Sequence, residues 1–184
     1  LIFGGAFIIL ISEYNNPDTI KDMSTGSKIM ASLFESVTVR TAGFFTIPQG
    51  NFRDTSYIII LILMLIGGSP MGTAGGLKTT TAAMMFLCVR STVKGHKGTE
   101  AFNRRISSDS VRTAISVLAI VAAIIIGAVF ILSVIEPFGL RDICFEVVSA
   151  MGTVGLTTGV TGSFSMAGKF ILCMVMFAGR IGPI

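Results

Sequence analysis

The sequence predicts an all-α membrane protein built from two helix–pore helix–helix repeats. Of its 184 residues, 52% are hydrophobic and only 13% are charged, and the mean hydropathy is +0.82. Soluble domains carry about a quarter charged residues. Ala114–Ile135 contains no charge and, as a helix, would be about 33 Å long, enough to cross the hydrocarbon core of a bilayer. The third observation is a loop that occurs twice between apolar segments, at Thr41–Thr46 and Thr153–Thr158.

The first half of the chain is predicted to contain a helix, a short helix and then a second long helix that is broken in the middle. Leu1–Ser12 is expected to end a spanning helix, because polar turn residues follow it. Ser27–Val39 is too short to span and is typical of a re-entrant pore helix. Ser56–Ile66 is again helical, and Leu77 begins a helix that runs to about Arg90. Between them lies Gly67–Gly76. In a continuous helix, each of its glycines would cost about 1 kcal/mol and its proline about 3 kcal/mol.

The second half repeats this order. Val111–Ile135 is predicted to span the membrane, and Ile143–Met151 is again short enough for a pore helix. Met166–Ile184 then returns as a second inner helix. Both repeats place a glycine 24 positions after the central loop glycine, at Gly67 and Gly179. Internal repetition of this kind is a strong signal of organisation.

The net charge of +4 is concentrated between the two repeats. The positive-inside rule predicts that the basic segment Arg90–Arg112 is cytoplasmic, and Asp109 or Ser110 is expected to cap the following helix. The same charge could also dock a soluble partner or anionic lipid. No nucleic-acid binding is expected, because the basic residues form one short loop.

The repeated loops predict a cation site made of backbone carbonyls. Thr153-Val154-Gly155 matches the Thr-Val-Gly start of potassium-channel filters, in which carbonyl oxygens replace the hydration shell of the ion. Gly43 and Gly155 permit backbone conformations that a Cβ would resist, and Thr41 and Thr153 can add hydroxyls or brace the loops. The predicted filter residues, whose carbonyls would hold potassium, are Thr41, Ala42, Gly43, Phe44, Thr153, Val154, Gly155 and Leu156.

Two cations stand in or beside apolar segments. Arg180 is costly there unless it faces water or a partner, which favours a gate role, although snorkelling near a helix end would also place it. Lys78 follows the glycine-rich break, but Leu77 stands where a phosphate-binding loop requires glycine, so nucleotide binding is excluded. Lys78 is expected to meet water instead. The predicted gate residues are Gly67, Gly68, Ser69, Pro70, Gly72, Gly75, Gly76, Lys78 and Arg180.

Glu35 and Glu146 lie in the two short helices. We expect them early in these helices, where an acid stabilises the N-terminus, or facing the pore, where they would attract cations. Four other charged residues are expected to be ordinary surface charges: Arg53, Asp54, Arg141 and Asp142.

Several motifs together closely resemble the Ktr/Trk/HKT potassium transporters. They are Val37–Phe44, Gly67–Pro70, Thr73–Thr81, Phe102–Ile106 and Gly152–Gly159. The resemblance covers nearly the whole chain and is strongest to the membrane subunit of the bacterial Ktr system. It implies four linked repeats around one pore, of which this chain is similar to the third and fourth, its C-terminal half.

By that resemblance, residues 1–92 form the third repeat, 93–108 a cytoplasmic basic loop and 109–184 the fourth repeat. Gly43 and Gly155 would then be the filter glycines of their repeats. The Gly67–Gly76 segment would be an intramembrane gating loop, and Arg180 the arginine that holds it closed.

The resemblance also implies partners and a location. The expected protein is a multi-pass homodimer in the bacterial plasma membrane, bound to cytosolic nucleotide-binding regulatory subunits of the RCK type and stimulated by sodium. Potassium would be its substrate, and no cofactor is expected. Two repeats cannot surround an ion, so the first two repeats are expected to be supplied by the rest of the protein or by other chains. Both chain ends lie in apolar stretches, which indicates a fragment.

The residues also bear on two other functional classes. A membrane enzyme would need paired carboxylates or a nucleophile with a base at membrane depth, and no Asp or His lies in the predicted spans, so no enzyme is expected. A non-conducting scaffold that uses the basic loop remains open. Within transport, sodium or ammonium could replace potassium.

Overall fold

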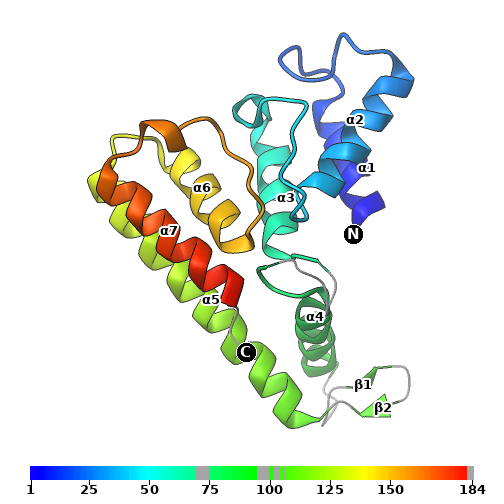
Figure 1. The fold of residues 1–184 in the computed structure, drawn as a ribbon. Coiled ribbons are helices and arrows are strands. Elements are labelled where there is room, and N and C mark those ends of the chain that lie inside the picture. Colours follow the sequence, from blue (N-terminus) through cyan, green and yellow to red (C-terminus); the bar gives the residue numbers. More distant parts are fainter. Residues whose placement is uncertain (69–74, 95–99, 102–103, 106, 182–184) are drawn as a thin grey trace.

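The computed structural model describes residues 1–68, 75–94, 100–101, 104–105 and 107–181 (Figure 1). Nearly all regular structure in these residues is helical. The exception is a pair of two-residue antiparallel strands, β1 (Glu100–Ala101) and β2 (Arg104–Arg105), in the segment between the repeats. The predicted all-α fold with two similar repeats is confirmed.

The first repeat comprises α1 (Ile2–Glu13), α2 (Thr25–Thr38), η1 (Gln49–Asn51) and α3 (Asp54–Leu65). Helix α1 contacts both α2 and α3. Gly5 makes this approach possible, because a Cβ there would lie 2.7 Å from both Leu63 Cδ1 and Ser36 Oγ. A side chain at this position would therefore require the Leu63 and Ser36 side chains to move.

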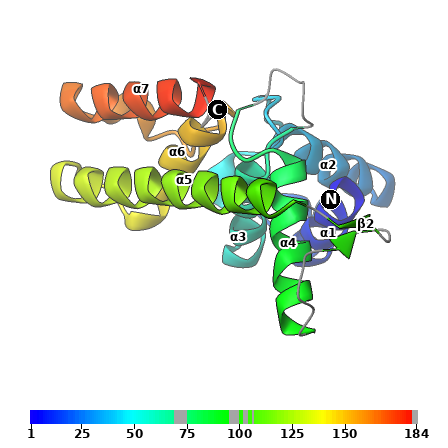
Figure 2. The same ribbon diagram turned by 90° about the horizontal axis from the view of Figure 1, so that it is seen from below.

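The second repeat comprises α5 (Ser108–Ile135), α6 (Leu140–Gly152), η2 (Thr161–Ser163) and α7 (Met166–Ile181). Each of its three helices contacts the other two, and α5 and α7 lie side by side in both views (Figures 1 and 2). Among the described residues, one helix is long and apolar enough to cross a bilayer, at Asp109–Ile135.

The start of α5 differs from the expectation. The N-cap is Ser107, whose hydroxyl accepts a hydrogen bond from the Ser110 amide at 3.3 Å. The prediction that Asp109 or Ser110 caps this helix is wrong, because the helix already begins at Ser108. Asp109 instead lies in the first turn, where its negative charge complements the helix dipole.

The break after α3 brings two backbone segments together. Helix α4 (Thr79–Val93) begins only after the glycine-rich segment. Ile66 and Leu77 form an isolated parallel bridge, and the Leu77 amide donates to the Leu65 carbonyl at 3.1 Å. A Cβ on Gly67 would lie 2.2 Å from the Gly75 carbonyl oxygen, so only glycine fits there. Three predicted gate residues, Ser69, Pro70 and Gly72, lie outside the described residues.

Helix α3 joins the two repeats. It contacts α6, while α4 contacts α5. Val154 and Leu156 of the second repeated loop lie in the same buried cluster as Ile60 and Met64 of α3. The second loop is therefore part of the core that the first repeat builds.

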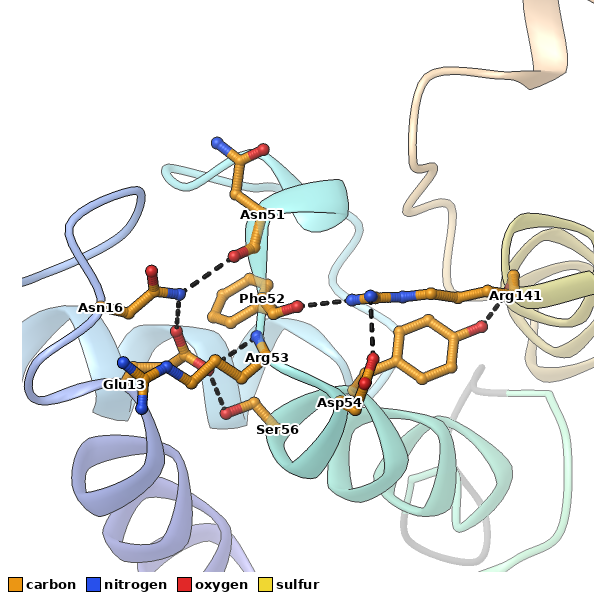
Figure 3. Close-up of polar contacts among 9 residues, drawn as sticks. Glu13, Asn16, Asn51, Phe52, Arg53, Asp54, Ser56 and Arg141 are labelled. Atoms are coloured by element: carbon orange, nitrogen blue, oxygen red, sulfur yellow. Dashed lines mark hydrogen bonds and ion pairs between the residues drawn. The ribbon is translucent and has the colours of Figure 1, made fainter. Parts of the chain in front are cut away.

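Two buried glutamates tie the end of the first helix of each repeat to the start of the third. Glu13 accepts hydrogen bonds from the Arg53 amide at 3.0 Å and the Ser56 hydroxyl at 2.5 Å (Figure 3). Glu136 accepts from both the amide and the hydroxyl of Ser165, at 3.1 and 2.5 Å. Arg53 and Ser165 each stand one residue before the third helix, so the two repeats share this connection.

Arg141, at the start of α6, bridges the repeats rather than serving only as a surface charge. Its guanidinium donates to the Phe52 carbonyl and pairs with Asp54 at 2.9 Å (Figure 3). It also lies over the Tyr57 ring, whose hydroxyl donates to the Arg141 carbonyl. The Asp54 side chain is 85% exposed, so the ion pair itself adds little stability. The contacts with Phe52 and Tyr57 carry the connection.

Candidate ion-binding site

The two repeated loops lie against each other. A Cβ built on Gly43 would be 2.7 Å from the Val154 carbonyl oxygen and 3.8 Å from Gly155 Cα. In the other direction, a Cβ on Gly155 would be 3.7 Å from Gly43 Cα. Loops whose central glycines are 112 positions apart in the chain thus meet backbone to backbone.

The same unusual backbone occurs in both loops. Thr41 and Gly43 have φ of 74° and 78°, and Thr153 and Gly155 have φ of 53° and 87°. Positive φ is rare for a β-branched residue and costs on the order of 1–3 kcal/mol. A strained threonine two positions before a left-handed glycine is therefore a property that the surrounding structure imposes twice.

The end of each short helix directs the loop that follows it. The Thr38 carbonyl accepts a hydrogen bond from the Ala42 amide at 3.0 Å. The Ser149 carbonyl accepts one from the Val154 amide at 2.9 Å. Ala42 and Val154 are the middle residues of the two Thr-x-Gly segments, so in each repeat a carbonyl near the end of the short helix holds the middle of the loop.

Glu146 braces the chain that follows the second loop. It is 4% exposed, and its carboxylate accepts hydrogen bonds from the Thr157 hydroxyl, the Thr158 amide and the Thr161 hydroxyl, at 2.6, 3.0 and 2.5 Å. The expectation that Glu146 and Glu35 stabilise helix N-termini is wrong. Glu146 lies in the middle of α6, and Glu35 lies fully buried in the last turn of α2.

A cavity of about 520 Å³ joins the second loop to α7. Thr153, Gly155 and Leu156 line it from the loop, and Met176 and Arg180 line it from α7. The arginine singled out by sequence therefore borders the same space as three predicted filter residues. It is exposed within the described chain.

The end of the glycine-rich segment is held beneath the second loop. The Gly75 amide donates to the Thr153 hydroxyl at 3.0 Å. A Cβ on Gly75 would lie 2.9 Å from the Gly179 carbonyl oxygen, and one on Gly179 would lie 2.1 Å from the Met151 carbonyl oxygen. The backbones at Gly75, Gly179 and Met151 thus pack against one another without side chains between them. Gly179 is the residue directly before Arg180.

Arg40 holds the other end of the glycine-rich segment. This residue directly precedes Thr41, and its guanidinium donates to the Gly67 carbonyl at 3.1 Å. One end of the segment is therefore bonded to Arg40, directly before the first loop, and the other end is bonded to Thr153 in the second loop. Sequence reasoning missed this role of Arg40, although the arginine stands inside a motif that carries the family resemblance.

One predicted gate residue, Lys78, lies away from the cavity. Lys78 is exposed at the N-cap of α4 and does not line the cavity. Its exposure agrees with contact to water, but the described structure does not bring it to the predicted filter residues.

Comparison with known proteins decides the family. A family model described as "TrkH: Cation transport protein" matches residues 5–184. The chain belongs to the TrkH family of cation transport proteins. The resemblance inferred from the motifs is therefore confirmed.

Relatives in the TrkH family include potassium uptake proteins of bacteria. The chain is 34% identical over its whole length to the Ktr system potassium uptake protein B of Vibrio alginolyticus, covering 40% of that protein. It is 38% identical over 96% of its length to the protein of the same name in Bacillus subtilis, again covering 40%. It is also 37% identical, over 99% of its length, to the potassium/sodium uptake protein NtpJ of Enterococcus hirae.

A solved TrkH structure shares the fold. The crystal structure of the potassium transporter TrkH from Vibrio parahaemolyticus matches 98% of this chain with a TM-score of 0.80 at 18% identity. The chain covers 41% of that structure and about two fifths of the curated relatives. This TrkH-family chain is therefore an all-α membrane protein that corresponds to less than half of its relatives.

Proposed function

We propose that the protein containing this chain takes up potassium through a pore in which the Gly43 and Gly155 loops form two of the filter segments. The observation that carries this proposal is the direct contact of the two loops with the same backbone conformation in each. Carbonyl oxygens presented by such loops replace water around an alkali cation without adding full charges. Binding is then strong enough to select an ion and weak enough to release it.

The pore must be completed by parts of the protein beyond this chain. Two repeats cannot enclose an ion, and the relatives are more than twice as long as the matched part. We therefore propose a four-repeat, multi-pass protein of the bacterial plasma membrane, with residues 1–92 as its third repeat, 93–108 as a cytoplasmic loop and 109–184 as its fourth. It is a transporter rather than an enzyme.

The glycine-rich segment between Gly67 and Gly76 is proposed to gate this pore. Its ends are bonded next to the two loops, through Arg40 and Thr153. Arg180 borders the cavity below Thr153, where a cation can oppose a permeating cation or hold the segment in place. Release of the segment would then open the path.

The proposed assembly contains a second copy of the protein and cytosolic nucleotide-binding subunits of the RCK type, with stimulation by sodium. The support is family membership together with the printed names of Ktr system relatives, which describe uptake systems. The basic segment between the repeats would face these subunits.

Growth of a potassium-uptake-deficient bacterium tests the proposed function. The full-length protein should restore growth at low external potassium, and growth should fail when potassium is replaced by sodium. A matched strain carrying the vector alone provides the control. An absence of rescue by a protein that is present in the membrane would overturn the proposal.

Sodium uptake is the second candidate. The 37% identical relative NtpJ carries the name of a potassium/sodium uptake protein. Uptake of labelled sodium by the same cells separates the candidates, because a potassium-selective protein should leave sodium accumulation at the level of the vector control.

A further inference from the structure

In the first repeat, one hydroxyl fixes the residue that follows the loop glycine. Thr38 is the last residue of α2 and is 1% exposed. Its hydroxyl oxygen accepts a hydrogen bond from the Phe44 amide at 3.0 Å, and the hydroxyl also donates to the Phe44 carbonyl oxygen. Phe44 directly follows Gly43, so Thr38 holds the chain where it leaves the centre of the loop.

In the second repeat, Ser149 makes the corresponding contact. It lies in α6 and is 3% exposed. Its hydroxyl donates to the Leu156 carbonyl oxygen at 2.6 Å. Leu156 directly follows Gly155, as Phe44 follows Gly43.

Both contacts end on the residue after the loop glycine, but they start from different positions of the short helices. Thr38 stands five positions before its glycine, whereas Ser149 stands six before its own. Each residue also accepts, through its main-chain carbonyl, the amide of the middle loop residue, Ala42 or Val154. The repeats thus form the same pair of bonds although the two residues stand at different distances from their glycines. The contact, rather than the position of the residue in the sequence, is what the repeats share.

We infer that Thr38 and Ser149 are positioning residues of the filter, and that the carbonyls of Phe44 and Leu156, which the sequence predicted to hold potassium, do not coordinate the ion. This inference rests on the proposed function. Each of these carbonyl oxygens is aimed at a buried hydroxyl of its own short helix, and the free energy of that hydrogen bond opposes a rotation of the carbonyl toward an ion. The coordinating set of each loop then ends at its glycine.

The number of coordinating carbonyls is one of the factors that set potassium over sodium selectivity. If Phe44 and Leu156 were released, an additional carbonyl could turn inward and the loop could change its spacing. Loss of either hydroxyl should therefore change selectivity more than it changes the amount of folded protein.

Selectivity of the full-length protein in liposomes tests the inference. Uptake of labelled rubidium would be measured in competition with potassium and with sodium. The preference for potassium is measured by how much more strongly potassium than sodium inhibits rubidium uptake. Ser149→Ala and Thr38→Val should each reduce this preference by about fivefold. The controls Ser149→Thr and Thr38→Ser keep a hydroxyl and should stay within about twofold of the unmodified protein.

A preference unchanged in both hydroxyl-free variants, in protein that still transports, would overturn the inference and leave the proposed function intact. Thallium positions in a crystal structure of the unmodified full-length protein give a reading that needs no variant. Among the residues of this chain, ion peaks should contact only the carbonyls of Thr41–Gly43 and Thr153–Gly155. An ion coordinated by the Phe44 or Leu156 carbonyl would also overturn the inference. A protein without any alkali-cation uptake would instead overturn the proposed function.

Discussion

The Thr153 hydroxyl accepts a hydrogen bond from the Gly75 amide at 3.0 Å, across a sequence separation of 78 residues. One threonine thus begins the second repeated loop and also fixes the end of the glycine-rich segment. The bond joins two segments that are far apart in the sequence, the proposed filter loop and the proposed gating segment. Any movement of the segment away from the loop has to break it.

Thr153→Val should loosen the glycine-rich segment. The substitution keeps the shape of the side chain but leaves the Gly75 amide without its acceptor, at a cost of about 1–3 kcal/mol. Hydrogen exchange of peptides that contain residues 75–78 should become faster. The control Thr153→Ser retains the hydroxyl and should exchange at the original rate. Equal protection in both variants would show that the bond does not hold the segment.

Gly43→Ala should damage the contact between the loops more than Gly155→Ala does. Both glycines have positive φ, but a Cβ on Gly43 meets the Val154 carbonyl at 2.7 Å, whereas the nearest atom to one on Gly155 is 3.7 Å away. Left-handed backbone alone costs about 1–2 kcal/mol for a non-glycine residue. Thermal unfolding of the purified full-length protein measures the difference.

Gly26→Ala is the matched control for these variants. Gly26 lies in α2, and nothing lies within 4 Å of a Cβ built there. Alanine should leave the unfolding temperature unchanged or raise it, since glycine weakens a helix by about 1 kcal/mol relative to alanine. A loss as large as that of Gly43→Ala would mean that crowding and φ do not explain the glycine requirement.

Much of the fold was accessible from the sequence, because its signals are local. The uncharged Ala114–Ile135 run predicts most of α5, and the glycines and proline after Ile66 predict the break between α3 and α4. Hydropathy and breakers act on neighbouring residues, so the helix bounds were predicted to within a few positions. The duplicated Thr-x-Gly segments predict that the two loops are related.

The contacts that hold the site were not accessible in this way. Arg40 and Gly67 are 27 residues apart, and Arg141 reaches Phe52 across 89 residues. Such pairs depend on how whole helices pack. The expectation that Glu35 and Glu146 lie early in their helices was wrong for different reasons. Glu35 is already the ninth residue of the predicted helix Ser27–Val39, whereas α6 begins at Leu140, three residues before the predicted start at Ile143. Glu35 therefore lies in the last turn of α2 and Glu146 in the middle of α6.

Glu146→Gln should destabilise the chain that follows the second loop. Its buried carboxylate accepts four hydrogen bonds, one each from Thr157 and Thr161 and two from Thr158, and bonds to a charged group are worth about 1.5–3 kcal/mol each. An amide offers one acceptor oxygen in place of two. The unfolding temperature of the full-length protein should fall by several degrees. Asp109→Asn, at an exposed position of α5, is the control and should have a much smaller effect.

Arg180→Ala should raise the rate of rubidium uptake if the arginine opposes the permeating ion or holds the segment closed. Arg180 borders the cavity shared with Thr153 and Gly155, and removal of its charge lowers a local barrier to a cation. Lys169→Ala, on the same helix, removes an exposed lysine that donates to the Gly162 carbonyl and should leave the rate unchanged. A slower rate in folded Arg180→Ala protein would argue against the gate.

The central claim is that the Gly43 and Gly155 loops together bind a dehydrated potassium ion. Rubidium uptake by the full-length protein in liposomes tests it when the unmodified protein is compared with Gly43→Asp and Gly155→Asp. The account predicts saturable uptake that potassium competes away in the unmodified protein. In each variant, uptake should be lost or no longer prefer potassium over sodium. Unchanged rate and preference in both variants would contradict the claim.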